Sequence, residues 1–129
     1  IWLNLDKTRP LGHFDTDFFL YYEDDDLTLR AFNQQIPMLL IPAITAQHRS
    51  RGSVKGKAPL KAEYIRGYFH ARSKIQFTAK HMGSGAARRL HLKTWALAVL
   101  SIGLRLLWPS PKHMARNWGR IVGLSRPVQ

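Results

Sequence analysis

The chain is 129 residues long and 45% hydrophobic, which fits one domain or part of one and argues against global disorder. It contains no cysteine, so disulfides, thiolate metal sites and cysteine nucleophiles are excluded. Its formal net charge of +12 favours anionic partners, namely nucleic acid, phosphorylated ligands or an acidic membrane surface.

The first feature along the chain is a concentration of acidic residues. Crowded carboxylates repel one another, which raises their pKa or attracts a cation, so a basic protein that keeps them together indicates a site for a base, a metal or both. The alternative is a solvated helix N-terminus, although four consecutive acids exceed what capping needs. The acids between residues 15 and 26 are Asp15, Asp17, Glu23, Asp24, Asp25 and Asp26.

Short apolar runs flank this acidic segment. The run from Phe18 to Tyr22 predicts a buried strand or a packed loop. The acids from Glu23 onward then suit the start of a helix of about ten residues, which ends before Pro37. Residues 37–41 predict a short apolar strand, and residues 44–47 a second extended segment.

His48 follows that second segment, and a cationic loop follows His48. Ligands bind where strands of an open α/β sheet end, and a neutral imidazole there could ligate a metal. The loop 49–57 has four cations, two glycines and two serines, a composition that predicts phosphate binding by amides and cations. The alternatives are a structural histidine and a solvated surface loop. The loop is not a P-loop, because Ala58 stands where Ser or Thr is required.

The second half of the chain predicts helices over 61–82, 90–108 and 112–122, separated near Gly83 and by prolines. Aromatic and cationic residues alternate over 64–74, a pattern that would suit single-stranded nucleic acid. On a helix, however, these residues spread around the circumference, so the nucleic-acid interpretation is the weaker alternative.

Residues 94–108 are largely apolar, with a narrow polar stripe of small or charged residues. The run is too short and too charged to predict a membrane span. Tryptophans near both ends and nearby cations favour an amphipathic helix in an anionic membrane interface. A helix packed against other protein is the equal alternative. The stripe consists of Thr94, Ala98, Ser101 and Arg105.

The segment from Phe14 to Arg30 reads Phe-Asp-Thr-Asp-Phe-Phe-Leu-Tyr-Tyr-Glu-Asp-Asp-Asp-Leu-Thr-Leu-Arg. Preceded by Gly12 and followed by Pro42, His48 and the Gly-Ser of the cationic loop, this string resembles the second half of family 2 inverting glycosyltransferases, most closely rhamnosyltransferase-like bacterial members. The resemblance covers about residues 3–80.

The resemblance implies an α/β fold: the C-terminal part of a GT-A fold, followed by C-terminal amphipathic helices. It implies an enzyme that transfers a sugar, with inversion, from a nucleotide-diphosphate donor to a saccharide or lipid-linked acceptor in cell-surface polysaccharide or glycolipid synthesis. A divalent metal, Mg²⁺ or Mn²⁺, would be the cofactor. The expected location is cytoplasmic, peripheral on the inner face of the bacterial cell membrane.

The same resemblance implies roles for individual residues. Asp24 would be the general base, with Glu23 and Asp26 positioning the base or the acceptor, and Tyr22 and Arg30 binding the acceptor. His48 would hold the metal. The donor diphosphate would contact Arg49, Arg51, Ser53, Lys55 and Arg72, although Ser73 replaces the asparagine that follows this arginine in the family.

The nucleotide-binding half of such an enzyme, with its Asp-x-Asp motif, would precede this region. We therefore expect the chain to be an incomplete enzyme that is inactive alone, with the catalytic part over 1–83 and a basic helical tail over 84–129. The alternatives are a basic nucleic-acid-binding module, disfavoured by the acidic string, and a membrane-peripheral adaptor without catalysis.

Overall fold

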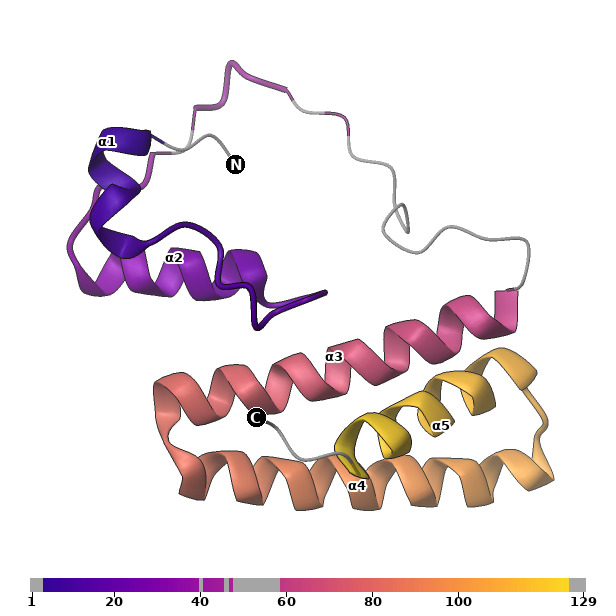
Figure 1. Cartoon of the computed structure of the whole chain (residues 1–129). Helices are drawn as coiled ribbons and strands as arrows, with labels where there is room; N and C mark the ends of the chain where they lie inside the picture. Colours follow the sequence, from indigo (N-terminus) through magenta and orange to yellow (C-terminus); the bar gives the residue numbers. More distant parts are fainter. Residues whose placement is uncertain (1–3, 40, 46, 48–58, 126–129) are drawn as a thin grey trace. The chain divides into compact units, whose positions relative to one another are not determined.

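The computed structural model describes residues 4–39, 41–45, 47 and 59–125 (Figure 1). By its contacts the chain divides into two compact units, Ile1–Ser50 and Arg51–Gln129.

The first unit is built around one helix, α2 (Glu23–Asn33). A short helix, α1 (Leu5–Thr8), and a 3-10 turn, η1 (Arg9–Leu11), precede it. Leu27 and Ala31 lie four residues apart on one face of α2 and pack against Leu11 in a small buried cluster, with Ile36 beside them. This cluster fixes the α2 face that points inward and leaves Asp24 and Asp25 of the first turn at the surface.

The second unit consists of three helices, α3 (Pro59–Met82), α4 (Ser84–Leu107) and α5 (Pro111–Ser125). Figure 1 shows α3 and α4 as a hairpin with α5 lying against both. The turn between α3 and α4 is made at Gly83, whose φ of 86° suits glycine. Ala71, Ile75, Ala87 and Leu124 form the core that joins the three helices, and Leu90 packs against it.

Glycines bring α3 and α5 into backbone contact. A methyl group added to Gly119 would collide with the carbonyl oxygen of Tyr64, and one added to Gly123 with that of Tyr68. On the opposing helix, a methyl group on Gly67 would collide with the carbonyl oxygen of Arg116. Close backbone approach of this kind requires small residues. Gly67 therefore does not interrupt α3, because tertiary contact outweighs its poor helix propensity.

The expected α/β fold with part of a GT-A sheet is wrong for this chain. Throughout the described ranges the regular structure is helical and no strand is present. The helices expected from Glu23 onward and over 61–82, 90–108 and 112–122 are confirmed, with somewhat different limits. The error thus concerns the extended segments alone.

The backbone explains why the run from Phe18 to Tyr22 is a packed loop rather than a strand. Tyr21 and Tyr22 have φ values of 70° and 68°, a left-handed conformation that ends any extended run. Phe18 is buried at 5% exposure, whereas Phe19 is 77% exposed. Further on, Pro37 to Leu39 follow α2 without forming a ladder in the described chain, and an extended segment becomes a strand only through a hydrogen-bonding partner.

Candidate functional site

The acidic residues predicted to form the site lie in the first turn of α2, as expected. This position is favourable because unpaired backbone N–H groups and the helix dipole make the N-terminus positive. Asp24 and Asp25 are exposed, Glu23 is half-buried and Asp26 is fully buried. Four neighbouring acids therefore occupy three different environments.

The backbone leading into this turn is strained. Tyr21 and Tyr22 are consecutive left-handed residues, and each such residue costs about 1–2 kcal/mol for a side chain with a Cβ. The first helical hydrogen bond follows directly, from the Asp26 N–H to the Tyr22 carbonyl at 2.9 Å. Burial, together with the negative charge of Asp25, raises the pKa of the Tyr22 phenol. Tyr22 therefore lies beside the carboxylates as a neutral hydroxyl.

Asp26 and Arg30 form a clip that fastens α2 to the preceding loop. The Arg30 Nε donates to Asp26 Oδ2 at 2.8 Å, and the Asp26 side chain has no exposed surface. The same guanidinium donates to the backbone carbonyls of Leu11, Gly12 and His13, the last two at 2.8 and 2.7 Å. The structure thus places both residues, expected to position or bind an acceptor, in a buried contact within the protein.

Of the three acids with predicted catalytic roles, Asp24 and Glu23 lie outside this clip. The Asp25 N–H donates to Asp24 Oδ1 at 3.0 Å, which orients the Asp24 carboxylate while its surface stays exposed. One oxygen of Glu23, Oε2, is buried and finds no hydrogen-bond partner within the described part of the chain. An unsatisfied buried carboxylate oxygen costs about 1–3 kcal/mol or more, and such groups often have a functional reason.

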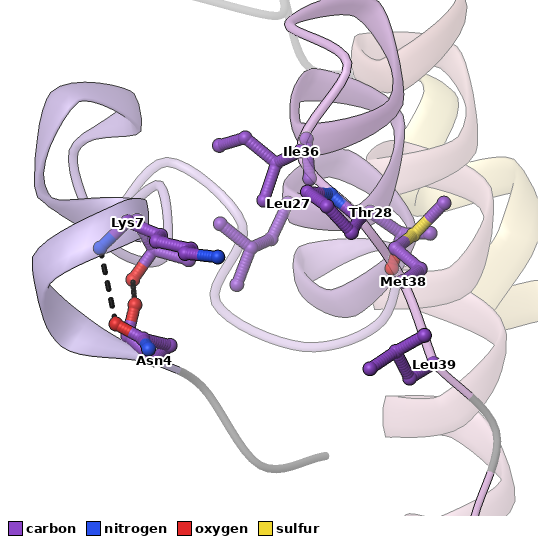
Figure 2. A pocket seen from close by; sticks show the side chains of 10 residues that line it. Asn4, Lys7, Leu27, Thr28, Ile36, Met38 and Leu39 are labelled. Carbon is purple, nitrogen blue, oxygen red and sulfur yellow. Dashed lines mark hydrogen bonds between the residues drawn. The ribbon is translucent and has the colours of Figure 1, made fainter.

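A cavity of about 310 Å³ lies in the same unit, between α1, α2 and the segment after α2. Figure 2 shows Leu27, Thr28, Ile36, Met38 and Leu39 around it, with Asn4 and Lys7 across the hollow. Its walls are mostly apolar. Thr28, which lines the cavity, lies one helical turn after Asp24. Because residues four apart share a helix face, Asp24 lies on the same side of α2 as Thr28. The sequence offered no signal for this cavity.

The predicted donor-binding residues are only partly described. His48, Arg49, Arg51, Ser53 and Lys55 lie outside the described residues. Arg72 lies half-exposed in α3, in the other compact unit. Among the residues that are described, no group of three His, Asp or Glu side chains lies close enough together to hold a metal ion.

The aromatic and cationic segment of α3 is engaged within the protein. The rings of Tyr64 and Tyr68 stack at 6.4 Å between centroids, and Tyr68 meets Phe69 edge to face at 5.0 Å. Both tyrosines belong to the turns of α3 that touch the glycines of α5. These ring contacts lie within α3 itself, and the three aromatic side chains are half-buried.

Glu63, the one acid after Asp26, is a structural residue that the sequence reasoning passed over. Its carboxylate is buried in α3 and bridges Arg66 at 2.7 Å and Arg116 of α5 at 2.6 Å. Burial alone would raise its pKa, but the two arginines outweigh burial and lower it. The sequence did contain a signal for this role, because Glu63 is a single acid among the eighteen basic residues that follow Asp26.

The chain has no match among protein-family models, curated proteins or solved structures.

Proposed function

We propose that this chain supplies the acceptor-activating carboxylates of an inverting glycosyltransferase that uses a nucleotide-diphosphate sugar. One observation carries the proposal: the clip of Asp26 and Arg30 holds α2 in place, while Asp24 in the same turn stays exposed. A general base must be held rigidly and must also reach its substrate. Asp26 meets the first requirement by holding the helix, and Asp24 meets the second because it is exposed.

The proposed reaction begins at an acceptor hydroxyl. Its oxygen forms a bond to the anomeric carbon of the donor sugar as the bond from that carbon to the diphosphate oxygen breaks. Attack from the opposite side inverts the configuration, and the nucleoside diphosphate leaves with its electron pair. The hydroxyl proton passes to the Asp24 carboxylate, because an un-ionised sugar hydroxyl is a poor nucleophile.

One neighbouring feature supports acceptor binding at this place. The cavity beside Thr28 can receive an apolar part of the acceptor, which suits a lipid-linked saccharide. On the donor side, His48, the cationic loop and a divalent metal would neutralise charge on the leaving diphosphate.

The test compares Asp24→Asn with Asp25→Asn in the protein as its gene encodes it. Both acids are exposed in the first turn of α2, so the second variant is a matched control for charge and helix capping. We expect Asp24→Asn to lower turnover by about 10²–10⁴-fold with unchanged donor binding, and Asp25→Asn to change it less than about tenfold. Transfer from uridine, thymidine and guanosine diphosphate sugars is the measurement.

Near-normal turnover in Asp24→Asn would remove Asp24 as the base. Equal losses in both variants would show that the acids act through their collective charge. Circular dichroism of each variant checks that α2 is intact, since a lost helix would lower activity without any catalytic role.

A further inference from the structure

The orientation of α4 is the reverse of what an aqueous environment favours. Its small and polar residues face the protein: Ala87 and Ala98 are buried, and Ser101 accepts a hydrogen bond from Asn117 of α5 at 2.7 Å. Its large apolar residues face outward, with exposures from 41% to 83%. We call these residues the apolar face of α4: Leu92, Leu97, Val99, Leu100, Leu104, Leu106 and Leu107.

A face of this size requires a partner. A surface helix of a water-soluble protein directs its apolar stripe inward, and contiguous exposed apolar patches mark sites of association. Trp95 and Trp108, exposed by 43% and 79%, lie near the two ends of the face. Tryptophan is enriched where a hydrocarbon layer meets water, so its position at both ends favours lipid as the partner.

The charges around the face select the kind of lipid. Arg88, Arg89 and Lys93 are exposed in the first turns of α4, and Lys112 is exposed at the start of α5. Neither helix contains an acid, and Glu63 of α3 is already neutralised by two arginines. Such a rim attracts anionic headgroups. We propose that the apolar face of α4 inserts into the interface of an anionic lipid bilayer.

The packing of α4 against α3 and α5 also decides whether the helix crosses the bilayer or lies in its plane. By length and composition, α4 is the one helix among the described residues that could cross a membrane. However, α3 and α5 pack along it between Ala87 and Ser101, and α3 carries charges such as Lys74 and the Glu63 cluster. Crossing would draw these charges into hydrocarbon, which is unfavourable for every charged side chain that has to be buried there. The helix therefore lies parallel to the membrane plane.

The test measures binding of the protein to vesicles of neutral phosphatidylcholine, with and without phosphatidylglycerol. We expect binding to the anionic vesicles at least tenfold tighter, weaker in high salt, and quenching of tryptophan fluorescence by brominated lipid tails. The double variant Leu100→Glu, Leu107→Glu should lower the affinity at least tenfold. Leu60→Glu is the control, since Leu60 is an exposed leucine of a different helix, α3.

A second pair of variants tests the charged rim. Arg88→Gln with Arg89→Gln should lower binding to anionic vesicles about tenfold or more, whereas Lys61→Gln in α3 should leave it nearly unchanged. Equal binding to both vesicle types would overturn the proposal. Absence of binding, with self-association that Leu100→Glu and Leu107→Glu abolish, would overturn it in favour of a second copy of the chain. Neither outcome depends on glycosyltransferase activity, so this inference is tested separately from the proposed function.

Discussion

Neighbouring acids in one helical turn have different roles because an α-helix turns about 100° per residue. Asp26 points into the protein and binds Arg30, whereas Asp24 and Asp25 point into solvent. The four consecutive acids from Glu23 to Asp26 therefore provide both a structural ion pair and an exposed carboxylate. This separation also provides a way to tell a stability defect from a catalytic one.

Asp26→Asn removes the charge that Arg30 requires but keeps the volume of the side chain. We expect it to loosen the attachment of α2 to Leu11 and Gly12 by about 2–3 kcal/mol, less than for a fully buried pair because Arg30 is 18% exposed. Limited proteolysis should show faster cleavage in the first unit than for the wild type or Asp25→Asn. Equal protection of all three proteins would mean that the clip does not hold the loop.

Glu63 makes stability depend on pH. Its folded pKa is lowered from the usual value of 4.5, so its contribution is present above that value and is lost as the pH falls through the folded pKa. Glu63→Gln should therefore lower the free energy of unfolding at pH 7 by about 1–3 kcal/mol. Thermal unfolding should show this difference shrinking below about pH 4.5. A difference that is constant with pH would contradict an ionic role, and Asp6→Asn controls for the loss of an exposed acid.

At the scale of elements, the glycines at the α3–α5 crossing matter more than helix propensity. Gly119→Ala would place a methyl group against the Tyr64 backbone, so the helices must separate, and we expect a loss of about 1–3 kcal/mol. Gly103→Ala is the control, because its methyl group would meet no described atom within 4 Å and should stabilise α4 by about 0.5–1 kcal/mol. Urea denaturation followed by circular dichroism measures both. Similar midpoints for the two variants would refute close packing.

The polar stripe of α4 shows what a single element leaves undecided. The helical period correctly places Thr94, Ala98, Ser101 and Arg105 on one side of α4. It does not tell whether that side faces solvent or another helix. The hydrogen bond from Asn117 and the burial of Ala98 show that this side faces α5. The two interpretations of the helix, interfacial or packed, are thus not exclusive: one side packs and the other is exposed.

At the scale of the whole molecule, the sequence by itself determined the helices, because their signals are local. Carboxylates begin α2, Gly83 ends α3, and prolines separate α4 from α5. Tertiary structure decided the rest. A strand depends on a partner distant in sequence, and the left-handed tyrosines remove the extended segment before the acids. The partners of Asp26 and Glu63, and the face that α4 leaves exposed, depend on contacts between elements, which periodicity cannot specify.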